Sequence, residues 1–175
     1  MALRTATKLE DFRDLALLVW RESRGESFDG QLAVAHSVMN RVARPSWWGS
    51  DLRAVIWKKW QYSSLTDPND PQLHLQPKLP DPSWLSALGA VHDVLYGGAD
   101  NPIPGADSYY DISMDKAGKP PNWIASARFV KQVGRLKFYD VDHDHEAAAL
   151  VAAGRDFDQE LREFLSGSVG TGPNT

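Results

Sequence analysis

One stretch near the start of the chain carries the clearest structural signal in the sequence. Residues 7–24 have the sequence TKLEDFRDLALLVWRESR. Thr7 and Glu10 have the spacing of a capping box, in which both side chains bond free amides at a helix N-terminus. Apolar residues then recur at steps of three and four: Leu9, Phe12, Ala16, Val19 and Trp20. This spacing predicts a helix over about residues 8–24, with Gly25 just beyond its end.

Two more helices are predicted directly after the first. Ser27 or Asp29 caps a helix with the same apolar spacing, and Pro45 ends it. Ser50 begins a shorter third helix, whose apolar side includes Trp60. The chain therefore opens with helices joined by short turns.

The second half of the chain has a different pattern. Residues 66–82 hold five prolines and are predicted to form a long irregular loop. Pro82 then begins a fourth helix that stops at Gly97-Gly98. Aromatic and β-branched residues over 106–113 and 129–141 predict the short strands of a small antiparallel sheet. Helices followed by a segregated sheet define an α+β fold that is mainly helical.

The organisation of the chain indicates one domain. Its 175 residues contain no internal repeat and no convincing boundary for a second domain. We expect a single domain over residues 1–165, which includes helices over 145–165, and a flexible tail over 166–175.

Composition and charge argue against several classes of function. The chain has no cysteine, which excludes disulfides and thiol catalysis. Its net charge of −4 argues against nucleic acid as a partner, because binding to phosphates needs clustered Lys and Arg. No apolar run approaches the roughly 20 residues that span a bilayer, so we expect no membrane anchor and no export signal. The sequence motifs of nucleotide binding, of the nucleophile elbow and of zinc proteases are absent.

One cluster of residues has the composition of a metal site. His143 and His145 flank Asp144, but no nearby residue completes a ligand set, and a helix cap is the better interpretation. We therefore expect no metal and no other cofactor, and we expect a monomer.

Tryptophan is concentrated in one part of the chain. Five of the seven tryptophans lie within 38 residues: Trp47, Trp48, Trp57, Trp60 and Trp84. Large aromatic side chains either fill a core or offer flat faces to a ligand. Helical spacing assigns Trp20, Trp60 and Trp84 to packing faces and leaves Trp47 and Trp48 unassigned.

Glu22 is the carboxylate with the most informative position. On a helical wheel it lies about 20° from Leu15 and about 40° from Leu18, beside the apolar stripe of the first helix. Partial desolvation there would raise the pKa of the carboxyl, as a general acid that works near neutral pH requires.

Two other interpretations of this region stay open. Glu22 would be an ordinary paired carboxylate if it formed an ion pair with Arg21, Arg24 or another cation at the helix end. Glu26 would be a competing acid if the helix continued through Gly25.

Several segments resemble a known family of proteins and occur in that family's order. They are Trp20–Glu26, Gly30-Gln31, Ala33–Ala35, Asn40–Val42, Gln61–Ser63, Ala90–Gly98, Tyr109-Tyr110, Pro121-x-Trp123 and Gly134-x-x-x-Phe138-Tyr139. Over about residues 13–140, the chain thereby resembles the SleB-like cell-wall hydrolases, the family of the spore cortex-lytic enzymes.

The resemblance implies a lysozyme-like α+β fold and a catalytic domain that cleaves the glycan strands of peptidoglycan. The bond would be the one between N-acetylmuramic acid and N-acetylglucosamine. The resemblance also implies a lytic transglycosylase, in which the sugar's own 6-hydroxyl attacks and one glutamate is first acid and then base. The family's catalytic glutamate falls on Glu22.

The resemblance also implies residues of the substrate cleft. Gln61, Ser63, Tyr109 and Tyr110 match positions that line the cleft in the family. The aromatic faces of Tyr62, Tyr109, Tyr110 and Trp123 are expected to stack on sugar rings.

The sequence departs from the family pattern at several positions. Arg21 and Ser23 replace small residues beside the glutamate, Ser64 stands where the family often has proline, and Leu136 stands where it often has histidine. The proline-rich segment 66–82 and the chain beyond residue 141 have no counterpart in the resemblance.

Two alternatives to lytic transglycosylation stay open. A hydrolytic muramidase would need a second carboxylate, for which Asp67, Asp70, Asp107 and Asp111 are candidates. A protein of another class would keep the fold without catalysis, as a peptidoglycan-binding module or a structural part of a virus particle.

The expected absence of an export signal also suggests a biological setting. An enzyme made in the cytoplasm would reach the cell wall after a separate protein permeabilises the membrane, as a bacteriophage endolysin does. A bacterial gene that had lost its signal would look the same.

Overall fold

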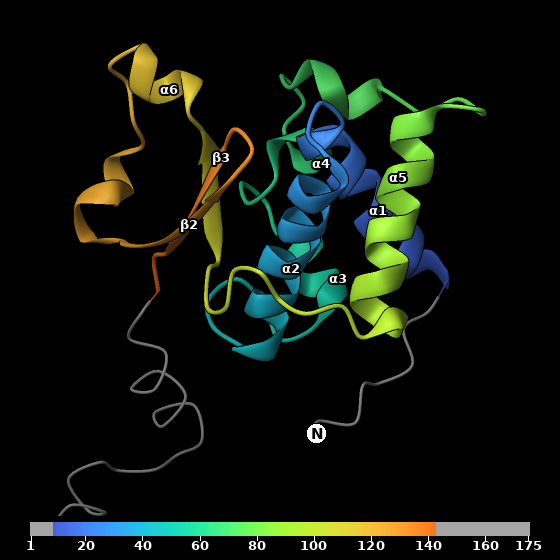
Figure 1. The fold of residues 1–175 in the computed structure, drawn as a ribbon, viewed down its shortest axis with the longest axis horizontal. Helices are drawn as coiled ribbons and strands as arrows, with labels where there is room; N and C mark the ends of the chain where they lie inside the picture. Colours follow the sequence, from blue (N-terminus) through green and yellow to red (C-terminus); the bar gives the residue numbers. More distant parts are fainter. Residues whose placement is uncertain (1–8, 143–175) are drawn as a thin grey trace, which may run out of the picture. The chain divides into compact units, whose positions relative to one another are not determined.

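Three helices enclose the hydrophobic core of the protein in a computed structural model, which describes residues 9–142. They are α1 (Leu9–Ser23), α2 (Phe28–Ala43) and α5 (Pro82–His92), and Figure 1 shows them packed together. The first two confirm the helices predicted from apolar spacing. Trp20 is buried and Trp84 packs against the core, as their spacing predicted.

The helix ends follow local capping chemistry. Ser27 caps α2, and its side chain accepts a hydrogen bond from the amide of Gly30. The π-helical turn η2 (Asp93–Gly97) continues α5, and Gly98 caps its end. Gly98 has a φ of 69°, in the left-handed region that glycine adopts freely.

Short elements connect α2 to α5. They are α3 (Leu52–Ile56), α4 (Ser63–Thr66) and the 3-10 turn η1 (Pro71–His74). The cap of α3 is Asp51, not Ser50 as predicted, because the Asp51 carboxylate accepts the amide of Ala54 at 2.8 Å.

The prediction that Trp60 packs on the third helix is wrong. The helix ends at Ile56, and Trp60 lies beyond it with a φ of 70° and 67% of its surface exposed. The helical spacing continued in the sequence after the helix itself had stopped.

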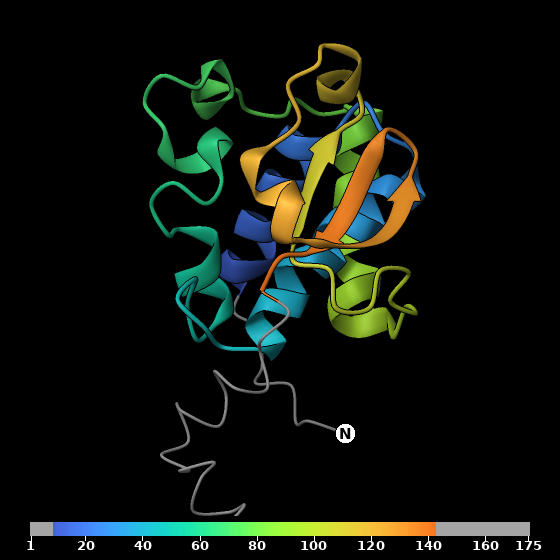
Figure 2. The ribbon, with the colours of Figure 1, turned by 90° about the vertical axis from the view of Figure 1, so that its left-hand side faces the viewer.

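A small antiparallel sheet lies beside the helices. Its strands are β1 (Ser108–Asp111), β2 (Arg128–Val133) and β3 (Leu136–Asp140), in the order β1-β3-β2. Figure 2 shows the sheet turned to the viewer, with α6 (Ser113–Lys116) and η3 (Asn122–Ser126) in the connection from β1 to β2. The sheet confirms the α+β fold expected from the sequence.

The two faces of the sheet have different roles because side chains alternate along each strand. Tyr109 is paired with Phe138, which is completely buried and joins the helical core. Tyr110 and Tyr139 stack on each other with ring centroids 5.8 Å apart. The central strand thus joins the sheet to the helices on one face.

Some predictions fall outside the described residues. They concern the helices over 145–165, the tail over 166–175 and the cluster at His143, Asp144 and His145. The single domain over 1–165 stays a prediction. Within residues 9–142, no helix combines the length and the apolar character needed to cross a bilayer.

Candidate active site

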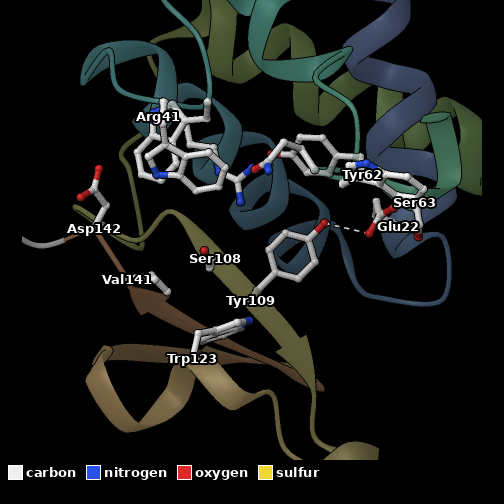
Figure 3. Close-up of a pocket in the computed structure, with 13 residues that line it drawn as sticks. Glu22, Arg41, Tyr62, Ser63, Ser108, Tyr109, Trp123, Val141 and Asp142 are labelled. Carbon is white, nitrogen blue, oxygen red and sulfur yellow. Dashed lines mark hydrogen bonds between the residues drawn. The ribbon is translucent and has the colours of Figure 1, made fainter. Parts of the chain in front are cut away.

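Glu22 lies in the last turn of α1 and is held by two hydroxyl groups. Its Oε1 accepts a hydrogen bond from Ser64 Oγ at 2.5 Å, and its Oε2 accepts one from the Tyr109 hydroxyl at 3.0 Å. Figure 3 shows Tyr109 pointing from the sheet toward Glu22. The carboxyl is therefore fixed from both sides, by the segment after α3 and by β1.

Burial raises the pKa of the Glu22 carboxyl above its ordinary value, because desolvation disfavours the charged form. The hydrogen bonds from Ser64 and Tyr109 oppose this shift, as does the positive charge of Arg41, while the negative charge of Asp70 adds to it. The pKa of Tyr109 lies well above its usual range, chiefly because of burial, so its hydroxyl stays protonated as a donor. The raised pKa of Glu22 agrees with the position predicted beside the apolar stripe.

The arginines beside Glu22 have other partners. Arg21 donates to the carbonyls of Ser64 at 2.7 Å and Leu75 at 2.8 Å, and Arg24 donates to Gln72 Oε1 at 2.6 Å. Both hold the proline-rich segment against α1. Within residues 9–142, no ion pair to Glu22 is formed, so the alternative of a simple helix-end pair is wrong.

The first helix does not continue to Glu26. The helix ends at Ser23, and Glu26 Oε2 accepts the backbone amide of Arg135 at 3.1 Å. The condition for Glu26 as a competing acid therefore fails, and its contact instead ties the α1–α2 turn to the β2–β3 turn.

The cleft consists of two adjoining hollows with Glu22 where they meet. Their volumes are about 520 Å³ and about 440 Å³, and both are lined by Glu22, Tyr109 and Trp123. Ligand sites in proteins have similar volumes, and a linear ligand that crossed both hollows would pass Glu22. In Figure 3 the first hollow runs from Glu22 toward Asp142, between Arg41 and Tyr62 on one wall and Trp123 on the other.

Three of the predicted cleft residues follow α3 and line the first hollow. Gln61 accepts a hydrogen bond from Arg41 Nη1 at 3.0 Å, and Ser63 donates to Asp70 Oδ2 at 2.6 Å. Tyr62 is almost fully buried, with the Arg41 guanidinium 5.0 Å from its ring centroid. Tyr62 is thus a wall of the cleft, and the open stacking face predicted for it is not present.

The predicted aromatic residues of the sheet divide between two roles. Tyr109 and Trp123 line both hollows, as expected for cleft residues. Tyr110 lines only the second hollow and is 6% exposed, because its hydroxyl donates to Asp115 at 2.8 Å and its ring packs on Trp123 and Tyr139. Tyr110 supports Trp123 more than it offers a face of its own.

Several lining residues were not predicted from the sequence. They are Arg41, Trp47, Trp48, Trp60, Ser108, Val141 and Asp142 in the first hollow. The sequence indicates Ser64 only as a departure from the family pattern. Its hydroxyl makes the shorter of the two hydrogen bonds to Glu22. Trp47 and Trp48 lie within the irregular turn after Pro45, where no periodicity indicates which side chain is buried.

The candidate second carboxylates occupy different environments. Asp107 is buried and accepts the amides of Val141 and Asp142, and Asp67 accepts the amide of Asn69, so both organise backbone. Asp111 lines the second hollow and accepts from Arg135. Asp70 affects Glu22 through its charge. Asp70 and Asp111 also accept backbone amides, those of Gln72 and Ser113. They stay the candidates for a hydrolytic mechanism because Asp70 acts on Glu22 through its charge and Asp111 lines the second hollow.

The site offers no donor set for a metal ion. No group of three or more His, Asp or Glu side chains with metal-binding geometry occurs in the described part of the chain.

A carboxyl with a raised pKa, held by hydroxyls in an aromatic-lined cleft between a helical core and a small sheet, defines the class of lysozyme-like domains. Comparison with known families is consistent with this class. The chain belongs to the cell wall hydrolase family, whose model matches residues 25–139. The matched range begins three residues after Glu22, so Glu22 as the catalytic glutamate stays a prediction from the resemblance of Trp20–Glu26.

Curated relatives share the same part of the chain. The spore cortex-lytic enzyme of Bacillus subtilis is 30% identical over 128 residues, which make up 73% of this chain and 37% of that protein. The spore cortex-lytic enzyme of Halalkalibacterium halodurans is 29% identical over 128 residues, or 73% of this chain and 34% of that protein. The chain thus spans about a third of the length of these relatives.

Solved structures confirm the lysozyme-like α+β fold. The catalytic domain of the germination-specific lytic transglycosylase SleB from Bacillus anthracis matches with a TM-score of 0.60 and 26% identity, over 78% of this chain and 99% of that domain. The catalytic domain of the Bacillus cereus SleB protein has the same fold, with a TM-score of 0.55 and 24% identity, over 77% of this chain and 93% of that one.

Proposed function

We propose that this chain cleaves the glycan strands of peptidoglycan as a lytic transglycosylase, at the bond between N-acetylmuramic acid and N-acetylglucosamine. The observation that carries the proposal is the position of Glu22, which is partly buried at the meeting point of two hollows and has a raised pKa. The family and the name of the Bacillus anthracis domain support the same substrate and reaction.

The proposed reaction begins with proton transfer from Glu22 to the glycosidic oxygen. The bond from this oxygen to the muramic acid C1 breaks through an oxocarbenium-like transition state, and the N-acetylglucosamine side leaves as an alcohol. The carboxylate left behind is stabilised by hydrogen bonds from Ser64 and Tyr109. The raised pKa favours the protonated form of the acid before this step.

The second half of the reaction returns the proton to Glu22. The 6-hydroxyl of the muramic acid attacks C1, its proton passes to the Glu22 carboxylate, and a 1,6-anhydro ring forms. No water enters, so a single carboxyl serves as acid and then as base. A mechanism with a single carboxyl fits a cleft in which the other two candidate carboxylates, Asp70 and Asp111, are already hydrogen-bonded to Ser63 and Arg135.

Mass spectrometry of digested peptidoglycan tests the proposed product. We expect soluble muropeptides that end in 1,6-anhydro-N-acetylmuramic acid. Products one water heavier would contradict transglycosylation and favour a hydrolytic muramidase, with Asp70 or Asp111 as the second carboxylate. Binding to cell walls without any soluble product would favour the non-catalytic alternative.

Removing the Ser64 hydroxyl is expected to change the pH dependence of the reaction. The hydrogen bond from Ser64 favours the ionised form of Glu22, so Ser64→Ala should raise the pKa of Glu22 further. Activity that requires the protonated acid is lost as pH rises through this pKa, so the alkaline limb of the pH–rate profile should move to higher pH.

The matched control for Ser64→Ala is Ser37→Ala. Ser37 is also completely buried, but its hydroxyl donates to the carbonyl of Val34 within α2. This variant should leave the alkaline limb in place. An unchanged limb in Ser64→Ala would show that the Ser64 bond has no influence on the acid.

A further inference from the structure

Trp60 has a backbone conformation that tryptophan rarely adopts. Its φ of 70° makes it the single non-glycine residue with positive φ between residues 9 and 142. It occupies the third position of a turn closed by a hydrogen bond from the Gln61 amide to the Lys58 carbonyl at 3.1 Å. Turns with this conformation normally have glycine or asparagine there. A bulky side chain in the left-handed region is strained, and such strain is concentrated at functional sites.

Packing does not explain why tryptophan stands at this position. The side chain of Trp60 is 67% exposed, so the strained backbone does not serve to fill the core. The residue instead lines the first hollow together with Glu22. The turn therefore presents a large indole face at the rim of the cleft.

A second exposed tryptophan lines the same hollow. Trp47 is 59% exposed and lies against Trp48, with ring centroids 5.3 Å apart. Trp48 is buried, and its Nε1 donates to the Arg44 carbonyl at 3.2 Å. The turn that carries them packs closely on α3, because a Cβ on Gly49 would come within 2.9 Å of Ala54. The backbone that carries Trp47 is thus packed against α3.

Lysine side chains accompany both exposed indoles. Lys59 Nζ lies 4.9 Å from the ring centroid of Trp60, and Lys58 Nζ lies 5.7 Å from that of Trp47. Lys58 Nζ also donates to the Trp47 carbonyl, and the carboxylate of Asp142 lines the same hollow. The rim thus combines apolar faces with cations, which suits a sugar that carries carboxylates.

We propose that Trp47 and Trp60 form an additional saccharide subsite, on which a pyranose of a glycan strand stacks while Lys58 and Lys59 contact carboxylates of its attached peptide. The proposal rests on the proposed function, since it concerns the same glycan strand. Trp60 then extends recognition beyond the bond next to Glu22 and favours longer, peptide-bearing strands.

Calorimetric titration with oligosaccharides tests the stacking part. The full chain with Glu22→Gln, which prevents turnover, is titrated with N-acetylglucosamine oligomers of two to six units. We expect affinity to rise with length, and Trp60→Gly to weaken binding of the hexamer about tenfold, as expected for loss of one aromatic contact. The same variant should unfold a few degrees higher, because glycine relieves the strained turn. A purely structural role of Trp60 would not give a higher unfolding temperature together with weaker binding of the hexamer.

The matched control is Trp57→Ala in the same segment. Trp57 is also exposed, at 42%, but it lines neither hollow and its Nε1 donates to Asp14 at 3.0 Å. This variant should bind the hexamer as the parent does.

The carboxylate part has its own test with Lys59→Glu. We expect it to weaken binding of peptide-bearing muropeptides and to leave binding of unsubstituted hexamer nearly unchanged, with a difference that shrinks at high salt. Equal weakening of both ligands would overturn the assignment of Lys59 to peptide carboxylates.

The outcomes also separate the subsite from the proposed function. If the Glu22→Gln chain binds no oligomer and the parent releases no muropeptide, the proposed function itself fails. If the parent cleaves and Trp60→Gly binds and cleaves long strands equally well, only the subsite is overturned.

Discussion

Replacing Glu22 by glutamine is expected to lower the release of muropeptides by roughly 10²–10⁴-fold, the usual contribution of a positioned general acid. Glutamine has nearly the same shape and keeps a carbonyl oxygen that accepts one of the two hydroxyl bonds, but it delivers no proton to a glycosidic oxygen. Solubilisation of purified peptidoglycan measures the effect. Glu10→Gln, an exposed position in the first turn of the same helix, is the control and should keep full activity.

The same variant is expected to be more stable than the parent at neutral and alkaline pH. The folded-state pKa of Glu22 is raised, so the folded protein binds more protons than the unfolded chain between the two pKa values. The stability of the parent therefore falls as pH rises through this window, whereas glutamine does not titrate. Thermal unfolding over a pH series should give the two proteins similar unfolding temperatures in acid. The unfolding temperatures should diverge as the pH rises through the window between the two pKa values. A folded Glu22→Gln protein with full activity would contradict the role of Glu22 as the acid.

The helical part of the fold was predictable because its signals are local. Apolar residues three and four positions apart recur through α1 and α2, and a serine cap and a proline mark the limits of α2. The strand regions were also predictable in outline. The sheet order was not, because β1 pairs with β3 across a connection whose length says nothing about strand neighbours.

The segment between α2 and α4 shows where sequence patterns failed. Trp60 continues the apolar spacing of α3, yet the helix stops at Ile56 and the next turn reverses the handedness of the backbone. The spacing of apolar residues alone does not show where a helix ends. The exposure of Trp47 and the burial of Trp48 depend in turn on a bridge between Ser46 and Gly49 and on contact with Arg41. These contacts join residues three and seven positions apart in an irregular turn, which leaves no periodic signal in the sequence.

The environment of Glu22 was predictable, and the residues around it were less so. The helix geometry placed Glu22 beside an apolar stripe, which agrees with its burial and raised pKa, while its role as the acid comes from the family resemblance and stays a prediction. Ser64 and Arg41 reach the site through contacts with residues far away in sequence. Ser64 carries a signal in the sequence only as a departure from the family pattern, and in the structure its hydroxyl donates to Glu22.

Two departures from the family pattern turn out to be connected. Arg21 donates to the carbonyl of Ser64, whose hydroxyl in turn donates to Glu22. Arg21 also holds the Leu75 carbonyl in the proline-rich segment. The arginine beside the acid therefore fixes the segment that orients the acid, and it does so without pairing with the acid itself.

Asn40 connects the helical core to the sheet that carries Tyr109. Its Nδ2 donates to the carbonyls of Ile103 at 3.0 Å and Ala106 at 2.7 Å, and its Oδ1 accepts from Asn101 at 2.7 Å. All of these partners lie in the segment that leads into β1. The side chain is buried, so no solvent replaces the bonds if it is removed.

Asn40→Ala is accordingly expected to destabilise the fold by about 3 kcal/mol or more, because two carbonyls lose their donor at roughly 1–3 kcal/mol each. This is a large part of the roughly 5–15 kcal/mol that keeps a typical domain folded. Chemical denaturation measures the loss, and Asn69→Ala, at an exposed loop position, should change stability by less than about 0.5 kcal/mol. Because the lost bonds also position the start of β1, the surviving folded protein should release muropeptides more slowly than the Asn69 control. Equal stability of the two variants would mean that the connection between α2 and the sheet depends on other contacts, such as the bond from Arg41 to the Asp107 carbonyl at 2.7 Å.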